Sequence, residues 1–146
     1  MVLRTVAGAP TGEDVADLRS WLLALDGGPQ VSETVVLHCD NHEDASATWA
    51  YAEADASSGI ARRRCLACGS ARPLLDSAQR WTHPPMWACQ GCRQSIAELA
   101  VGLSLPDGEH VRWLCLAARC VHCGRLAGLT DALLPDQPLA EVLDRL

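Results

Sequence analysis

The feature that most constrains this chain is its set of eight cysteines, because seven of them fall into pairs with the spacing of metal ligands. One pair, Cys65-x2-Cys68, follows an arginine run and precedes Gly69, which can take the left-handed conformation that a tight ligand turn needs. Three further half-sites have the same ligand-x2-ligand spacing: Cys39/His42, Cys89/Cys92 and Cys120/Cys123. Because tetrahedral zinc takes four ligands, four half-sites predict two Zn²⁺ ions per chain.

The cysteines could instead form disulfides, but only in an oxidising compartment. Residues 1–10 lack the long apolar core of a signal peptide, and no apolar run approaches the length of a membrane span. We therefore expect reduced cysteines, metal binding and a cytoplasmic location.

The apolar residues also favour a metal-stabilised fold. The 146 residues allow one domain or two small ones that share a core, and they include no Phe, one Tyr and five Trp. The core must therefore be built from Leu, Val and Ala around a few indoles. Because such a core is thin for two lobes, bound metal is a plausible stabiliser.

Charge is distributed unevenly along the chain. The formal net charge is −6, which does not favour generic affinity for nucleic acid. Residues 1–59 carry two arginines against ten acidic residues, residues 60–93 carry six against one, and residues 94–146 carry four against seven. The middle of the chain is therefore the basic part.

The hydrophobic pattern predicts a mainly β fold with short flanking helices (α+β). A helix is predicted over residues 11–26, with Thr11 placed to cap it, and another over residues 138–146. The first helix has one apolar stripe, formed by Val15, Leu18, Leu22 and Leu25. Strands are predicted over 31–38, 47–51, 60–64 and 111–117. Residues 94–104 alternate like a strand, but their apolar positions also fit a helix.

An internal repeat bears on which half-sites pair. Spacing alone favours the two middle half-sites, which read C-x2-C-x20-C-x2-C. Self-comparison favours another pairing, because the first half-site precedes the third by 50 residues and the second precedes the fourth by 55. Cys68 and Cys123 are also each followed by Gly at +1, Leu at +6 and Asp at +8. This indicates a duplicated unit with five residues added inside the second hairpin.

Each unit contains a knuckle, a β-hairpin and a second knuckle, and over residues 31–131 this arrangement resembles the tandem zinc-ribbon proteins. The resemblance implies two zinc-ribbon-like units packed together, with sequential pairing. Site A would then be Cys39, His42, Cys65 and Cys68, and site B would be Cys89, Cys92, Cys120 and Cys123. His38 is an alternative ligand at site A, and pairing of Cys65/Cys68 with Cys89/Cys92 stays open.

The predicted organisation is a helical segment (1–30), unit A (31–76), a linker (77–85), unit B (86–133) and a C-terminal helix (134–146). The linker signal, rich in proline and polar residues, extends over 69–85. Cys115 is predicted to be a core residue, because it lies between two leucines on a strand. His83, His110 and His122 are expected at the surface or in turns.

We expect no enzymatic activity. Four protein ligands leave zinc no open position for water, as in structural sites. Glu43 directly follows His42, whereas the zinc deaminase pattern needs H-x-E, and no P-loop or dinucleotide motif occurs. Zinc ribbons occur in transcription and translation machinery, so the resemblance implies an adaptor that presents a β-surface to a protein or nucleoprotein partner.

Two alternatives accompany the adaptor hypothesis. The basic middle could bind nucleic acid, since arginine pairs with phosphate and indole stacks on bases; the residues are Arg62, Arg63, Arg64, Arg72, Arg80, Trp81, Trp87 and Arg93. Those arginines could equally offset the charge of the zinc thiolates, with the tryptophans filling the interface between units. The second alternative is a zinc-thiolate redox switch at site A.

Overall fold

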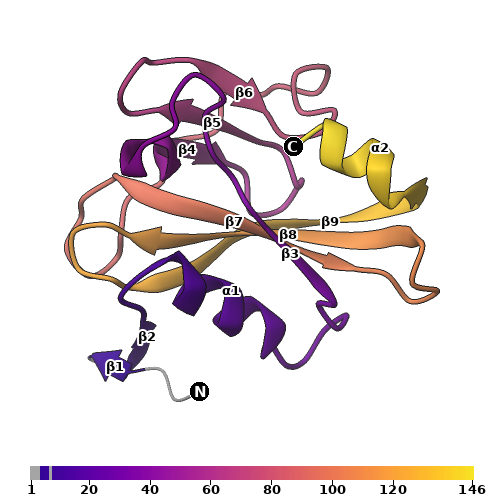
Figure 1. Cartoon of the computed structure of the whole chain (residues 1–146), viewed down its shortest axis with the longest axis horizontal. Coiled ribbons are helices and arrows are strands. Elements are labelled where there is room, and N and C mark those ends of the chain that lie inside the picture. The colour runs from indigo at the N-terminus through magenta and orange to yellow at the C-terminus, as the bar shows by residue number, and fades with distance from the viewer. Residues whose placement is uncertain (1–3, 7) are drawn as a thin grey trace.

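The main feature of the computed structural model, which describes residues 4–6 and 8–146, is one antiparallel sheet of seven strands (Figure 1). The strands follow the order β6-β5-β4-β7-β8-β9, and β3 also pairs with β7. A separate hairpin, β1-β2, precedes helix α1. The bounds are β1 Arg4–Val6, β2 Ala9–Thr11, α1 Val15–Leu23, β3 Glu33–Val36, the 3-10 helix η1 Ala45–Thr48, β4 Trp49–Ala54, β5 Ala61–Cys65, β6 Ala71–Pro73, β7 Ala97–Ser104, β8 His110–Cys120, β9 Leu126–Pro138 and α2 Leu139–Asp144.

Two three-stranded units make up most of this sheet, β4-β5-β6 in unit A and β7-β8-β9 in unit B. In each hairpin an alanine lies opposite the first cysteine of the second knuckle, Ala50 opposite Cys65 and Ala97 opposite Cys120. Ala50 and Ala97 are also partners of each other across β4 and β7. The units therefore meet edge to edge through equivalent positions, around a local pseudo-two-fold axis. An origin by duplication stays a prediction.

The register refines the predicted five-residue insertion. Ala97 precedes Cys120 by 23 positions and Ala50 precedes Cys65 by 15, so the hairpin of unit B is eight residues longer. The step from the first knuckle to the paired alanine is shorter in unit B, five positions after Cys92 against eight after His42. The offset of five is therefore the net of an eight-residue addition and a three-residue loss.

Both faces of the central strands are covered, and all eight residues of β7 are buried. On one face, Leu18 and Leu22 of α1 pack with Ala100 and Ala117. The other face carries the main core, in which leucines of β7 and β8 meet unit A and α2. Figure 1 shows α1 on one side of these strands and α2 on the other. Two-sided burial explains why the apolar positions of residues 94–104 also fit a helix, because a clean alternation marks strands that have one face in water. The strand alternative is confirmed.

The N-terminal helix begins later than the sequence predicts. Its stripe is confirmed, with Leu18 and Leu22 fully buried. The predicted cap at Thr11 is wrong, because Thr11 belongs to β2 and the Oδ1 atom of Asp14 accepts the backbone N–H of Asp17 at 3.0 Å. A helix N-cap is an extended residue whose side chain reaches the first turn, and Asp14 meets both conditions.

Strand β6 lies in a segment with a linker signal, and strand β9 extends into residues predicted to be helical. The segment 69–85, which has the composition of a linker, contains β6 and the fully buried Ser77, whose Oγ accepts the backbone N–H of Ala61. Strand β9 continues to Pro138, into the residues assigned to the C-terminal helix. Prolines and polar residues at the outer strand of a sheet conceal it from pattern analysis, because an edge strand tolerates both.

Candidate metal centres

The structure gathers the four half-sites into two clusters, and in each cluster the ligand atoms all lie within 4.8 Å of one another. Each cluster combines a half-site that precedes a hairpin with the half-site that follows it. The clusters are therefore those of sequential pairing, and the pairing favoured by the x20 spacing is wrong. Site A contains Cys39, His42, Cys65 and Cys68, and site B contains Cys89, Cys92, Cys120 and Cys123.

The sulfur separations fit zinc. The Sγ atoms of Cys39 and Cys68 are 3.7 Å apart, and at site B the Cys89–Cys123 and Cys92–Cys120 pairs are each 3.5 Å apart. A tetrahedral zinc with Zn–S bonds of about 2.3 Å holds its sulfurs about 3.8 Å apart, whereas a disulfide holds them at about 2.05 Å. None of the eight cysteines is in a disulfide. The two clusters thus fit two zinc ions per chain.

Three of the four half-sites share one backbone turn. The carbonyl of the first ligand accepts the N–H of the residue four positions on, and its own N–H donates to the carbonyl five positions on, all at 2.8–2.9 Å for Cys65, Cys89 and Cys120. This turn requires positive φ at its fifth residue, which is +75° at Gly69, +80° at Gly124 and +65° at Arg93. Arg93 therefore occupies the position that glycine holds in the other two knuckles.

The first half-site of site A has a different turn. Its Cys39 carbonyl accepts from His42 at 3.4 Å, and the Cys39 N–H donates to Ala47 instead. Among the described residues, the buried Nε2 atom of His42 has no hydrogen-bond partner. A buried ring nitrogen without a partner is costly unless it binds something, so this atom fits a metal ligand. His38 lies outside the cluster, with an exposed ring 3.5 Å from Asp40.

Site A is less buried than site B, although its Cys65 is buried. Cys68 is exposed and Cys39 is half-buried. Sequence reasoning missed two polar neighbours of Cys68: Ser70, whose Oγ is 3.3 Å from the sulfur, and Asn41, whose Nδ2 is 3.7 Å from it. Hydrogen bonds, chiefly from the side chain and backbone N–H of Ser70, lower the pKa of Cys68 to about 5. In the sequence, the only sign of Ser70 and Asn41 as neighbours of the site is that each is a polar residue two positions after a ligand cysteine.

Site B is set into the core. Cys89 and Cys120 are buried, with exposed fractions of 1% and 0%. Burial raises the pKa of Cys120 to about 12, whereas for Cys89 the effect of burial is outweighed by backbone N–H groups of Cys92 and Gly91, and its pKa falls to about 7. A zinc ion stabilises the thiolate form of both, so metal loading removes the cost of burying these sulfurs as ions.

A buried ion pair that sequence reasoning missed lies beside the junction of the units. Glu98 of β7 and Arg119 of β8 are cross-strand partners, joined at 2.9 Å between Oε1 and Nε, and their side chains are 8% and 12% exposed. Thr48 of unit A donates to the other carboxylate oxygen at 3.0 Å. Buried charged residues nearly always have such a partner. Which residues are buried and face each other across strands is set by the fold, so the sequence alone does not reveal this pair.

The arginines of β5 point to both faces of the sheet, because neighbouring residues of a strand alternate. Arg62 forms a bidentate ion pair with Glu53 at 2.9–3.1 Å and stacks 4.3 Å from the ring centroid of Trp81. Arg64 donates to the carbonyl of Gly69 at 3.0 Å. These partners are a carboxylate, an indole ring and a carbonyl, so the alternative that the arginine run offsets the charge of the zinc thiolates stays a prediction.

The other residues of the predicted partner surface occupy separate places. Arg63 and Arg72 line one cleft beside site A. Arg80 pairs with Asp76 at 3.2 Å, and Trp87 packs against the main core. Arg93 lies in the site B knuckle. The structure therefore brings together Arg62 with Trp81 and Arg63 with Arg72, but not all eight residues.

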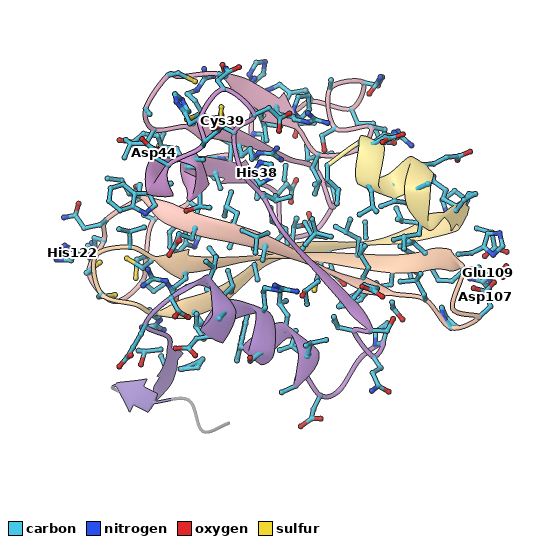
Figure 2. All side chains as sticks on the ribbon, viewed as in Figure 1. His38, Cys39, Asp44, Asp107, Glu109 and His122 are labelled. Atoms are coloured by element: carbon cyan, nitrogen blue, oxygen red, sulfur yellow. The ribbon has the colours of Figure 1, made fainter. Side chains whose placement is uncertain are left out.

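The remaining sequence candidates lie where they were expected. Cys115 is buried, and burial raises its pKa to about 11. His83 and His122 are exposed, and His110 lies beside the turn of the long hairpin. Figure 2 shows His122 at the site B end of the sheet, with Asp107 and Glu109 at the opposite end. None of the three histidines belongs to either ligand cluster.

No protein-family model, curated protein or solved structure matched this chain when it was compared with them. Neither α1 nor α2, the α-helices of the described residues, has the length and apolar character to span a bilayer.

Proposed function

We propose that this protein is a non-enzymatic zinc-binding adaptor that presents a rigid β-surface to a protein partner. The observation that carries the proposal is that each cluster supplies four protein ligands, so each fits a closed tetrahedral site without an open position for substrate. Zinc then fixes the two ends of each hairpin relative to each other. The function lies in the surface that the two centres hold in place.

The outer edge of β9 is the surface that best fits this role. Among the described strands, β9 has a neighbour only in β8, which leaves its other edge without a sheet partner. Leu133 on this strand is 80% exposed, and a groove of about 630 Å³ runs beside it. Edge strands with exposed apolar side chains accept an extended peptide through backbone hydrogen bonds.

Charge supports a protein partner over nucleic acid. The net charge of −6 repels phosphate chains, and each thiolate-bound zinc centre adds no positive charge. Arg62, Arg64 and Arg80 have carboxylates or carbonyls of this chain as partners. Nucleic acid would have to compete with those contacts.

Affinity capture from native lysate, with and without nuclease, tests the adaptor. The proposal expects a defined partner that survives nuclease, is lost with Leu133→Asp and is retained with Leu23→Asp. Leu23 is the matched control, because it is also exposed, at 48%, but lies on α1. Recovery that disappears with nuclease, or that ignores Leu133→Asp, contradicts the proposal.

A second candidate is a redox switch at site A, favoured by the exposure of Cys68 and its 3.7 Å distance from Cys39. In this reaction hydrogen peroxide takes two electrons from the two thiolates, a Cys39–Cys68 disulfide forms, two protons convert the peroxide to two waters, and Zn²⁺ leaves. One equivalent of peroxide should then release one zinc, and Cys68→Ser should abolish the peroxide-dependent disulfide. Release of both ions together contradicts a switch confined to site A.

A further inference from the structure

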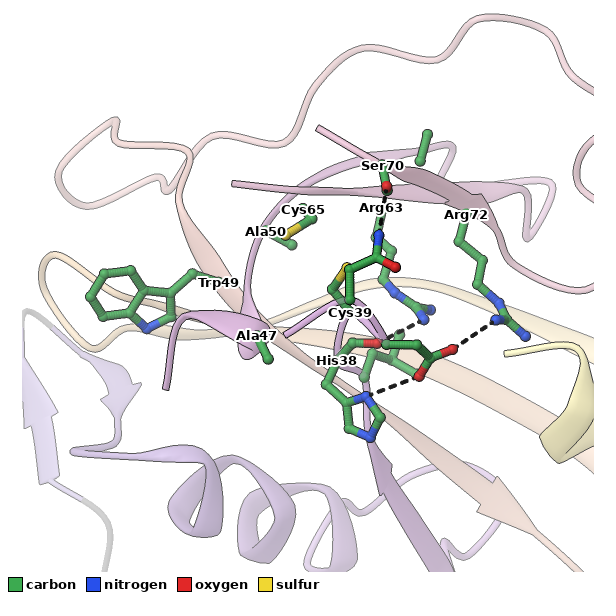
Figure 3. A pocket seen from close by; sticks show the side chains of 13 residues that line it. His38, Cys39, Ala47, Trp49, Ala50, Arg63, Cys65, Ser70 and Arg72 are labelled. Carbon is green, nitrogen blue, oxygen red and sulfur yellow. Dashed lines mark hydrogen bonds and ion pairs between the residues drawn. The ribbon is translucent and has the colours of Figure 1, made fainter. Parts of the chain in front are cut away.

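A cleft of about 180 Å³ lies beside site A, between the first knuckle and the edge of β4, β5 and β6 (Figure 3). A second cavity of about 310 Å³ extends from it toward α2. The two cavities share five lining residues: Leu37, His38, Asp40, Arg63 and Arg72. Two of the five are arginines, so the place where the cavities meet is cationic.

Arg63 brings more hydrogen-bond donors to this cleft than the protein satisfies. A guanidinium carries five N–H groups. Within the described chain, its one hydrogen bond runs from Nη2 to the carbonyl of His38, at 3.3 Å. Its cross-strand partner on β6 is a second cation, Arg72. A half-buried cation next to a second cation favours an anion in the space between them.

The carboxylate of Asp40 is an anion of this chain that lies beside the two arginines, but its contacts are weak. Its carboxylate lies 3.6 Å from Arg72 and 3.5 Å from the ring of His38, and its side chain is 72% exposed. Arg72 itself is anchored elsewhere, by a 3.0 Å hydrogen bond to the carbonyl of Asp144. Because exposed ion pairs of this length contribute little to stability, an external anion can replace Asp40.

We propose that the cleft between Arg63 and Arg72 binds an oxyanion, a phosphate group or a carboxylate, in place of Asp40. Both arginines extend into the cleft from adjacent strands (Figure 3). Guanidinium groups match the paired oxygens of phosphates and carboxylates, which gives geometric selectivity as well as charge. Exchange of Asp40 for the ligand keeps the local charge balanced. The site does not depend on the adaptor proposal, because a free anion can fill it.

Titration of the zinc-loaded full chain with inorganic phosphate, and separately with a capped Gly-Glu-Gly-Glu peptide, tests this site. The readout is the NMR shift of the Trp49 indole N–H, because Trp49 lines the cleft. Asp40→Asn should tighten binding about threefold to fivefold by removing the competing carboxylate. Arg63→Gln should weaken it about tenfold or more, the effect of a lost charge-assisted hydrogen bond. Arg64→Gln, on the opposite face of β5, is the matched control and should change nothing.

Saturable shifts with phosphate identify a site for free oxyanions, and shifts with the peptide alone identify one for acidic side chains of a partner; both support the proposal. The absence of saturable shifts with either probe overturns it, as does unchanged affinity in a folded Arg63→Gln variant. If Arg63→Gln does not retain two zinc ions, Asp40→Asn decides alone, and no gain in affinity then overturns the proposal.

Discussion

Sites A and B have almost the same ligands but different surroundings. Site B lies at the base of the long hairpin whose strands are buried on both faces, and two of its sulfurs are buried. Site A has a histidine in place of one cysteine, only one buried sulfur, and a cleft beside it. Each site also has one exposed sulfur, Cys68 at site A and Cys123 at site B. The ligand spacing therefore specifies a metal site, while the surrounding strands decide how far its loss disturbs the fold.

The largest difference is expected between ligand substitutions at the two sites. Cys120→Ser should unfold most of the protein, because structural zinc contributes about 10–16 kcal/mol of binding free energy and Cys120 is in the core. Cys68→Ser should leave the sheet folded with one zinc. Zinc per chain and circular dichroism measure both outcomes, with Cys115→Ser as a buried non-ligand control that keeps two ions. Equal loss of structure in the two ligand variants contradicts the distinction.

The two Glu–Arg pairs of the hairpins should respond differently to substitution. Glu98→Gln should lower the free energy of unfolding by about 3–5 kcal/mol, because it leaves the buried Arg119 without a counter-ion. Glu53→Gln breaks a pair whose side chains are 21% and 27% exposed, and should cost about 1 kcal/mol. Urea unfolding measures both values. Equal losses of unfolding free energy in Glu98→Gln and Glu53→Gln would contradict the expectation that burial makes the Glu98–Arg119 pair the more costly one to break.

The knuckle glycines Gly69 and Gly124 differ in the space that is available for an added Cβ. Gly69→Ala and Gly124→Ala both place alanine at positive φ, which costs about 1–2 kcal/mol. A Cβ at Gly124 would also lie 2.7 Å from the carbonyl oxygen of Gly12, whereas one at Gly69 meets nothing within 4 Å. Gly124→Ala should therefore melt lower than Gly69→Ala. Identical melting temperatures would show that the backbone of Gly12 can move away from the added Cβ without cost.

The smallest effect concerns the hairpin turns. In unit B, hydrogen bonding to Asp107 raises the pKa of His110, and backbone and side-chain hydrogen bonds from His110 lower that of Asp107. A raised histidine pKa stabilises the folded state below about pH 6.5, and this contribution is lost as the pH rises through the folded value. The lowered carboxyl pKa contributes above about pH 4 and is lost as the pH falls.

His110→Ala should therefore lower the melting temperature by about 1 °C at pH 5.5, and by less at pH 8.5. The turn of unit A is the control, because Asp55 has its pKa lowered by Ser57 and no histidine takes part. Asp55→Ala should show the same loss at both pH values. A larger loss for His110→Ala at pH 8.5 would contradict the sign of the histidine shift.

The sequence predicts the ligands better than their surroundings. Ligand spacing is a short-range feature, so the half-sites, and through the repeat their pairing, can be inferred from the sequence alone. The stripe of Leu18 and Leu22 likewise predicts α1, because its helical period is intact. The choice between His38 and His42 depends on which ring is buried, and ligand spacing carries no information about burial.

Features that depend on distant segments were not predictable. The Glu98–Arg119 pair needs β7, β8 and Thr48 together. Strand β6 and the end of β9 are edge segments with proline, whose composition is that of a loop. The meeting of Ala50 and Ala97 is set by sheet register, which a period-two pattern does not specify when both faces are buried.

Native mass spectrometry during chelator titration tests the central claim most directly. We expect a chain with two zinc ions, then a populated species with one, in which alkylation labels Cys39, Cys65 and Cys68 while Cys89 and Cys120 stay protected. That order follows from the cleft beside site A and from the second buried sulfur of site B, since Cys89 and Cys120 are both buried whereas only Cys65 is buried at site A. Absence of zinc, intact disulfides, or an intermediate labelled first at site B would contradict the account.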